Sequence, residues 1–127
     1  SNRSELTKTL TRLFNYWVKL SNSNSSGFVK CYTCDRVCHI SGVDAGHFQA
    51  SKKTSTRWDL MNVKPQCREC NNKLNGMRVE FAKRLDIEYG KGTAESIELK
   101  ANTPSNFTTM DLEEMITIYE ELIYTYS

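Results

Sequence analysis

Two Cys-x-x-Cys pairs are the residues of this sequence whose spacing most directly indicates chemistry. Cys31 and Cys34 lie in "CYTC", and Cys67 and Cys70 lie in "CREC". Structural Zn²⁺ is commonly bound by four thiolates in a tetrahedron, and two pairs on separate chain segments can supply them. The spacing therefore predicts a structural zinc site. A redox dithiol is the alternative for either pair alone, but two pairs without a βαβ pattern favour the metal.

A fifth cysteine and a histidine follow the first pair. Cys38 and His39 lie in "CDRVCHI". Their spacing from Cys34 does not suit either of them as a replacement for a paired cysteine in the zinc site. We expect Cys38 to be a free or buried thiol, and His39 to lie at the surface or beside the zinc ligands. Recruitment of either residue into a metal site is the alternative.

His47 and Asn71 could do chemistry of a second kind. Imidazole has an unperturbed pKa of about 6.5, so His47 in "AGHF" can accept a proton near neutral pH. Asn71 directly follows Cys70 and offers a carbonyl oxygen to a hard cation such as Mg²⁺. The zinc site would hold the helix start that carries Asn71 against the strand that carries His47. We therefore expect both residues in one site.

Helical periodicity indicates the elements around these residues. Helices are expected over residues 4–20, 77–89, 94–100 and 110–126. Ser4 is the expected N-cap of the first helix, and Thr108 or Thr109 that of the last. Met77 is expected on the buried face of the second. The apolar stripe of the last helix is expected in the core, with a dimer contact as the alternative.

Length and composition indicate a small globular protein. The chain has 127 residues, of which 39% are hydrophobic and 10% aromatic, so we expect one domain with a modest core that a metal would help to stabilise. It has no apolar run long enough to span a membrane and no signal-peptide pattern. Five cysteines, an odd number, fit a reducing compartment. We expect a cytoplasmic protein with no membrane partner.

Charge is distributed unevenly along the chain. Residues 1–85 carry 15 Lys and Arg against 6 Asp and Glu, whereas residues 86–127 carry 2 against 9. A basic surface could bind a polyanion, because Lys and Arg supply most of the sequence-independent affinity for nucleic acid. An ordinary surface with a large dipole is the alternative.

The order of these motifs resembles a known nuclease superfamily. A Cys-x-x-Cys pair, a strand histidine, an asparagine five residues before a second pair, and a polar residue directly after it are similar to the HNH, or ββα-metal, nucleases. More narrowly, "DAGHFQASK", "TRWDLMNVKPQCRECNNKLNG" and "EYGKG" resemble the phage NinG (Rap) recombination nuclease family, and "LFNYWVKL" fits it too. The resemblance covers about residues 10–92.

The resemblance implies a fold and an activity. The expected fold is α+β in a single domain, 1–127: an N-terminal helix and polar loop in 1–27, a small zinc-stapled ββα-metal, treble-clef-like core in 28–90, and C-terminal helices in 91–127. The implied activity is that of a DNA endonuclease that depends on Mg²⁺ or Mn²⁺ and acts on branched recombination intermediates in a bacterial host. Junction cutting usually needs two coordinated sites, so a homodimer is expected.

The resemblance also implies roles for individual residues. His47 takes the general-base position, Asn62 that of the middle asparagine that supports the inter-strand loop, and Asn71 the last metal-binding position. Many HNH proteins carry an Asp or His ligand directly before the base, where this sequence has Gly46. Asp44 is therefore a possible cation ligand, although on a regular strand it would face away from His47 unless a bulge redirects it.

Phosphodiester hydrolysis explains why these residue types occur together. It needs a base, a cation at the phosphate oxygens and a positive group for the developing charge. Arg57 is the candidate for the positive group. Candidate DNA contacts are Lys52, Lys53, Arg57, Lys73 and Arg78; ordinary surface charge is the alternative for each. A non-catalytic, zinc-stapled nucleic-acid-binding module is the alternative for the whole protein, and the sequence does not distinguish DNA from RNA.

Overall fold

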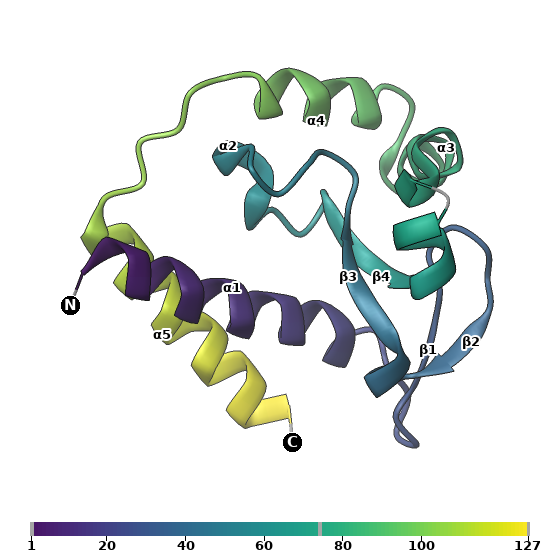
Figure 1. The fold of residues 1–127 in the computed structure, drawn as a ribbon, viewed down its shortest axis with the longest axis horizontal. Helices are drawn as coiled ribbons and strands as arrows, with labels where there is room; N and C mark the ends of the chain where they lie inside the picture. Colours follow the sequence, from purple (N-terminus) through teal and green to yellow (C-terminus); the bar gives the residue numbers. More distant parts are fainter. Residues whose placement is uncertain (1, 74, 127) are drawn as a thin grey trace.

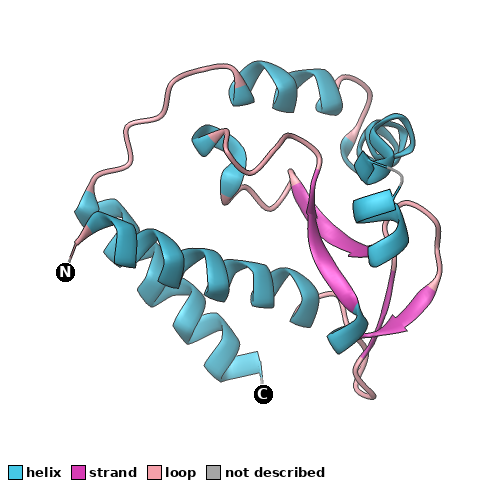
Figure 2. Cartoon of the chain, viewed as in Figure 1, coloured by secondary structure: helices cyan, strands magenta, loops and turns pink. Residues whose placement is uncertain are grey.

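The computed structural model describes residues 2–73 and 75–126, and it is a mixture of helices and small sheets, which confirms the predicted α+β class (Figure 1). The chain begins with α1 and ends with α5, and two β-hairpins lie between them (Figure 2). The elements are α1 (Arg3–Leu20), β1 (Phe28–Lys30), β2 (Val37–His39), β3 (Val43–His47), α2 (Thr54–Arg57), β4 (Val63–Cys67), α3 (Arg78–Tyr89), α4 (Thr93–Ala101) and α5 (Thr109–Tyr126).

The strands form two separate two-stranded antiparallel sheets, β1 with β2 and β3 with β4. In the second sheet, Val43 pairs with Cys67 and His47 pairs with Val63, with every residue between them in register. Cys67 and His47 therefore lie at opposite ends of the same hairpin. The loop that joins these strands contains α2.

α1 is the amphipathic helix that its sequence period predicts. Its apolar side packs against α5 and the β3–β4 hairpin; the buried residues of this cluster are Leu6, Leu10, Leu13, Phe14, Val18, Trp58, Val63, Leu112 and Tyr119. The rings of Phe14 and Tyr119 meet edge to face, with their centroids 5.3 Å apart. The stripe of α5 therefore lies in the core.

The caps of these two helices differ in how well the sequence predicted them. The prediction of Ser4 as the N-cap of α1 was wrong, because the Asn2 side chain accepts a hydrogen bond from the Glu5 amide and α1 begins at Arg3. At α5, the Thr108 hydroxyl accepts from the Asp111 amide and the Asp111 carboxylate accepts from the Thr108 amide. This reciprocal capping confirms Thr108.

A second apolar cluster lies under α3 and α4. Its buried members are Phe48, Phe81, Leu85 and Ile97. The prediction that Met77 belongs to the same helix face was wrong: Met77 has a φ of 52°, in the left-handed region, so α3 begins only at Arg78. Met77 packs instead against the cysteine cluster. Cys70 lies in a short helical turn over Glu69–Lys73, and the left-handed residues Gly76 and Met77 separate this turn from α3.

No helix among the described residues is long and apolar enough to span a membrane.

Candidate metal centre and histidine cleft

The four paired cysteines come together in space. The Sγ atoms of Cys31, Cys34, Cys67 and Cys70 all lie within 4.8 Å of one another. A tetrahedral site with Zn–S bonds of about 2.3 Å requires S···S distances of about 3.8 Å, and the Sγ atoms of Cys34 and Cys67 are 3.8 Å apart. The four cysteines are thus positioned to bind a metal ion, and their geometry and soft ligand chemistry fit Zn²⁺.

Hydrogen bonds and burial set the charge of this cluster. Burial raises the pKa of Cys70 to about 12, and burial also raises the pKa of Cys34. Burial would raise the pKa of Cys31 too, but hydrogen bonds from the Cys67 backbone and from Thr33 outweigh it and lower that pKa. Full ionisation of the four thiols therefore needs a compensating cation, as thiolate metal sites require.

Cys38 and His39 lie outside the group of four. Cys38 is half-buried and packs against the cluster without belonging to it. The His39 imidazole exchanges a 2.9 Å hydrogen bond with the Ser41 hydroxyl and stacks edge to face with Phe28. The described structure therefore does not recruit either residue into this site.

His47 is half-buried at the end of β3. Its Nε2 lies 3.1 Å from the Arg57 carbonyl oxygen, and its Nδ1 lies 3.3 Å from that of Ala45. A neutral imidazole carries one N–H, so the shorter contact favours donation from Nε2 and leaves Nδ1 as an acceptor. Burial lowers the pKa of His47 and the Arg57 charge lowers it further, against the opposing effect of the two carbonyl contacts. His47 is therefore neutral near pH 7 and able to take up a proton.

A cleft of about 640 Å³ opens beside His47. Its lining residues are Thr11, Asn15, Ala45, His47, Ser51, Lys52, Arg57 and Asn71. Four of the predicted site residues, His47, Asn71, Lys52 and Arg57, thus share one cleft, and no carboxylate is among the lining residues described. We call this the histidine cleft; its side-chain charges are those of Lys52 and Arg57.

The Arg57 side chain is held at the rim of the cleft. Its Nε donates a 2.6 Å hydrogen bond to the Ser51 carbonyl oxygen, and its guanidinium carbon lies 5.2 Å from the centroid of the Trp58 ring. Trp58 itself is buried, and its Nε1 donates to the Thr11 hydroxyl at 3.1 Å. Arg57 is thereby fixed between the loop backbone and an aromatic ring.

Asp44 lies next to Asn71. The Asn71 Nδ2 donates a 3.1 Å hydrogen bond to Asp44 Oδ2, and Asp44 Oδ1 is 3.6 Å from Arg68 Nε. β3 has no bulge, since its register is continuous, so Asp44 keeps the strand direction expected for it. The contact arises because the turn after Cys70 carries Asn71 over to Asp44. Asn71 and Asp44, whose side-chain oxygen atoms could bind a cation, therefore lie side by side next to the histidine cleft.

Gln66 occupies the space beside Gly46. A Cβ at Gly46 would lie 1.9 Å from Gln66 Oε1, which is far inside van der Waals contact. The fully buried Gln66 donates from Nε2 to the Thr33 hydroxyl at 3.0 Å and to the Gly76 carbonyl at 2.9 Å. Gly46 is the position at which this sequence departs from the HNH pattern. A glycine is needed there because the Gln66 side chain, which links β4 to Thr33 and Gly76, occupies the space of a Cβ. The sequence held no signal for this role of Gln66.

Asn62 is buried and holds the inter-strand loop. Its Oδ1 accepts a 2.7 Å hydrogen bond from the Gln49 amide, while its Nδ2 donates to the carbonyl oxygens of Gln49 and Thr56 at 3.1 and 3.0 Å. This side chain joins the two ends of the segment that carries Ser51, Lys52 and α2. It does not line the histidine cleft.

Three predicted DNA contacts lie outside the cleft. Lys53 donates to the Asn102 side chain, and the Arg78 guanidinium lies 5.9 Å from the centre of the Phe48 ring. Lys73 is exposed in the turn that follows Cys70. Conversely, Thr11 and Asn15 line the cleft although nothing in the sequence pointed to them; they are ordinary polar positions of an amphipathic helix.

Fold and site together define a small α+β protein with a four-cysteine cluster able to bind a metal ion and a neighbouring histidine cleft. The family described as Bacteriophage Lambda NinG protein matches residues 1–126, and the chain belongs to this family. "Protein ninG" of Enterobacteria phage H19B is 28% identical over 94 residues, and the match covers 68% of this chain and 47% of that relative. The chain thus spans about half the length of this curated relative. No solved structure matches the chain.

Proposed function

We propose that this chain is a DNA endonuclease of the HNH type that depends on a divalent cation and cleaves branched recombination intermediates. The observation that carries the proposal is the histidine cleft, in which a neutral His47 and the cation-ligand candidate Asn71 come from segments 24 positions apart in the sequence. The β3–β4 hairpin and the turn after Cys70 correspond to the two strands and the helix of a ββα-metal core. The host cytoplasm is the compartment that this activity implies.

His47 is the general base in this proposal. Its Nδ1 accepts a proton from water, because Nε2 is engaged with the Arg57 carbonyl oxygen. The same carbonyl fixes the ring and stabilises the imidazolium that forms. Arg57 and Lys52 provide positive charge for the phosphate as negative charge develops on it.

Asn71 and Asp44 are the proposed ligands of a catalytic Mg²⁺ or Mn²⁺. Their side chains touch at 3.1 Å and offer an amide and a carboxylate oxygen. Mg²⁺ suits such a small ligand set, because it keeps several waters and binds substrate phosphates as well as one or two protein oxygens. When bound, the cation would supply Lewis-acid stabilisation of the phosphate and the leaving oxygen.

A structural Zn²⁺ at the four cysteines supports this arrangement. Cys70 immediately precedes Asn71, and Cys67 ends the strand that pairs with β3. Binding of all four thiolates by one ion would fix the turn that carries Asn71 relative to the strand that carries His47. At the opposite end of the hairpin, Asn62 would act as a positioning residue: its hydrogen bonds to Gln49 and Thr56 would hold the β3–β4 loop that carries Lys52 and Arg57.

A non-catalytic nucleic-acid-binding module is the second candidate. The observation that favours it is the pairing of Gly46 with Gln66, because Gln66 fills the place where many HNH proteins carry a ligand directly before the base. Such a module would need the zinc site and basic residues but would respond neither to Mg²⁺ nor to loss of His47.

A cleavage assay distinguishes the two candidates. Wild type, His47→Ala and the control His39→Ala would be incubated with four-way junction, flap and linear duplex DNA, in Mg²⁺, Mn²⁺ or EDTA, after their zinc contents have been shown to be equal. The nuclease proposal expects cation-dependent nicking that persists in His39→Ala and disappears in His47→Ala. Binding without cutting under every cation would contradict the nuclease proposal and leave the nucleic-acid-binding module.

A further inference from the structure

One polar face of α1 continues from the histidine cleft. Thr11 and Asn15 line the cleft together with His47. Residues spaced by three, four or seven positions lie on the same side of a helix, so Lys8, Arg12 and Lys19 share this side with them. The apolar residues that α1 buries lie on its opposite side. We define Lys8, Arg12 and Lys19 as the basic face of α1.

We propose that α1 is part of the DNA-binding site: its basic face binds the phosphate backbone on either side of the cleaved bond, and Asn15 contacts the strand inside the cleft. This inference rests on the proposed function, because it assigns α1 to the same site, and it adds residues outside the HNH-like segment. It explains why a helix that belongs to no ββα core lies along the cleft.

The amide of Asn15 is an unpaired polar group at the cleft. Its Oδ1 is buried and has no hydrogen-bond partner among the described residues. Amide oxygens in protein interiors are normally hydrogen-bonded; here no described residue holds this oxygen, so the amide is available to a ligand in the cleft. An asparagine amide offers both donors and an acceptor, which suits a phosphate oxygen or a water that is held beside it.

Thr11 fixes the position of α1 relative to the cleft. Its hydroxyl accepts the hydrogen bond from Trp58 Nε1, at the end of α2. Trp58 follows Arg57, whose carbonyl oxygen contacts His47. A short chain of contacts therefore ties α1 to the general-base candidate, and Asn15 keeps a defined place next to it.

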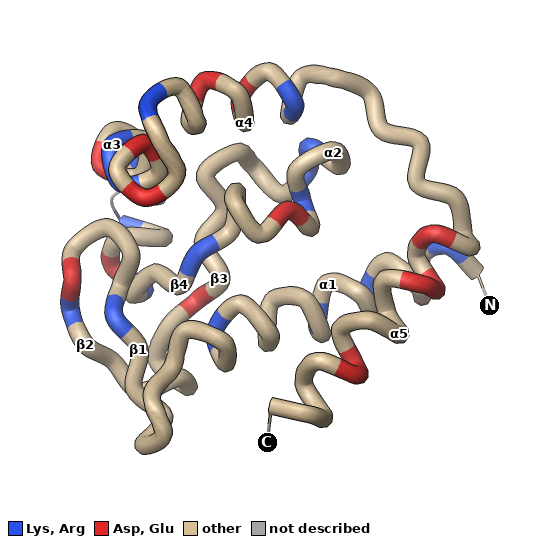
Figure 3. The backbone as a smooth tube through the Cα atoms, turned by 180° about the vertical axis from the view of Figure 1, so that it is seen from behind, with Lys and Arg blue, Asp and Glu red and all other residues tan. Residues whose placement is uncertain are grey.

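The charges of α1 complement a polyanion. The helix carries Arg3, Lys8, Arg12 and Lys19 against a single acid, Glu5 in its first turn. None of the three residues of the basic face has an ion pair among the described residues, although the acid-rich α5 packs against α1. Figure 3 shows this division, with Lys and Arg bands on α1 and Asp and Glu bands on α5. These three basic side chains have no ion pair, and no carboxylate is among the described residues that line the neighbouring cleft. Both features favour a phosphate group as the ligand.

The length of the basic face suits a short run of duplex. Lys8 and Lys19 are separated by about 16 Å along the helix axis, at 1.5 Å per residue. This distance corresponds to about five base pairs at 3.4 Å per pair. The cleft opens on this stretch, at Thr11 and Asn15. The face can therefore contact phosphates on both sides of the reacting one.

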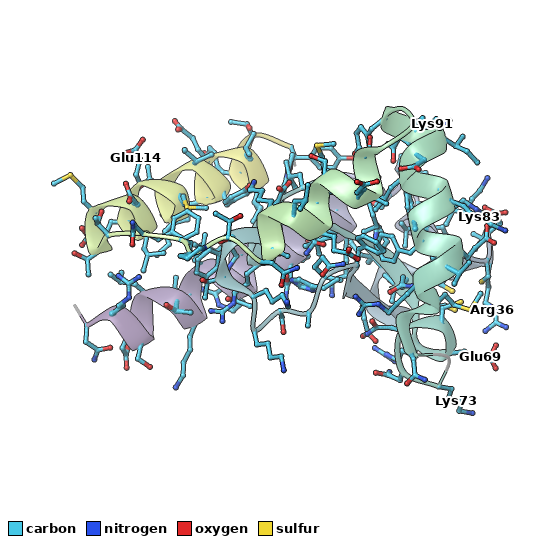
Figure 4. The ribbon with its side chains drawn as sticks, turned by 90° about the horizontal axis from the view of Figure 1, so that it is seen from above. Arg36, Glu69, Lys73, Lys83, Lys91 and Glu114 are labelled. Atoms are coloured by element: carbon cyan, nitrogen blue, oxygen red, sulfur yellow. The ribbon has the colours of Figure 1, made fainter. Side chains whose placement is uncertain are left out.

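Binding by a cleavage-deficient protein tests the inference. In a His47→Ala background, the triple variant Lys8→Ala, Arg12→Ala, Lys19→Ala would be compared with a control triple, Lys30→Ala, Lys83→Ala, Lys91→Ala, which removes the same charge. The control residues are exposed; Lys83 and Lys91 lie at the α3 end of the molecule (Figure 4). Fluorescence anisotropy with a labelled duplex and a labelled four-way junction would be measured at several salt concentrations.

The expected result is specific to the basic face. Its loss should weaken binding about tenfold or more and flatten the slope of log K against log salt by roughly two to three, about one per removed phosphate contact. The control triple should change affinity by no more than about twofold. Equal losses in both triples, or no loss in either, would overturn the inference.

The contact of Asn15 with the DNA strand is tested separately. Asn15→Ala and the conservative Asn15→Gln would be assayed on the cleaved substrate with the intact His47. We expect Asn15→Ala to lower kcat more than it raises KM, and Asn15→Gln to recover part of the loss; unchanged kinetics would remove Asn15 from the site. If wild type never cleaves but still loses affinity with the basic face, the nuclease proposal fails and the DNA-binding role of α1 stands. If wild type cleaves and the triple variant binds normally, the DNA-binding role of α1 fails and the nuclease proposal stands.

Discussion

The imidazole of His47 is half-buried and shares its cleft with the guanidinium of Arg57, and both features affect its protonation. Burial and the charge of Arg57 lower the pKa of His47. The neutral form is therefore favoured in the folded state, so its contribution to stability is complete above pH 6.5, its unfolded pKa, and is lost as the pH falls through the lower folded value. The base of the proposed reaction stays active into mildly acidic solution.

This protonation predicts a pH–rate profile. The acidic limb of log(kcat/KM) should lie below pH 6.5, the ordinary histidine pKa. Arg57→Gln removes a charge that lowers this pKa, so the limb should move to higher pH, in addition to any loss of rate. Lys53→Gln, outside the cleft and bonded to Asn102, should leave the limb in place. A limb that is identical in all three proteins would contradict the electrostatic role of Arg57.

Gly46 is a second residue with a specific requirement. Gly46→Ala should destabilise the protein by about 1–3 kcal/mol, because its Cβ would overlap Gln66 Oε1. Gly42→Ala is the control, since no atom lies within 4 Å of the Cβ it would add. Urea denaturation would measure both. The pair Gly46→Ala, Gln66→Ala should cost less than the sum of its single changes, and strict additivity would refute the overlap as the cause.

The packing of α1 on α5 predicts which helix positions hold the fold. Leu10 is fully buried between these helices, so Leu10→Ala should cost about 2–5 kcal/mol of unfolding free energy. Tyr124 is 84% exposed on α5, so Tyr124→Ala should change it by no more than about 0.5 kcal/mol. The midpoints of urea titrations would give both values, and similar losses would show that Tyr124 is covered by another chain.

The cysteine cluster predicts one bound metal ion per chain. Chelation, or Cys67→Ser, should remove the metal and lower the melting temperature, because buried thiols then lose the cation that compensates them. Acidification should release the metal as well, since protons compete for the thiolates. Cys38→Ser is the matched control and should retain one equivalent of zinc by elemental analysis. Zinc loss in Cys38→Ser alone would reassign the ligand set.

Local sequence predicted elements better than the breaks between them. The 3.6-residue period of α1 and the capping of α5 at Thr108 both follow from side chains that lie close together in the chain. The kink at Met77 does not, because a left-handed φ is uncommon at a non-glycine residue, and the cysteine cluster that Met77 packs against forms only in the folded chain. The cap of α1 was also missed, because Asn2 and Ser4 are both residue types that cap helices and no local rule chose between them.

The site was predictable where spacing itself carries the chemistry. Two Cys-x-x-Cys pairs specify a metal cluster in any fold that brings them together, and the residue after the second pair then lies near the strand between them. Hence His47 and Asn71 were expected in one site and share the histidine cleft. Thr11 and Asn15 were not found, because the orientation of α1 over β3 is a property of tertiary packing.

At the scale of the whole molecule, cleavage of a four-way junction requires two active sites. The functional proposal therefore predicts two chains per junction. Light scattering of His47→Ala with and without a four-way junction would count them. A linear duplex of equal length is the control and should bind chains without fixed stoichiometry. One chain per junction at saturation would contradict paired cleavage and favour a flap or other single-site substrate.

The pairing of α1 with α5 also sets an order of events during synthesis. During synthesis, the apolar side of α1 is made about ninety residues ahead of its partners Leu112 and Tyr119. At 5–20 residues per second, that delay is roughly 5 to 20 seconds. For that time the nascent chain carries the apolar side of α1 without its partners on α5, and the packing of α5 then covers it.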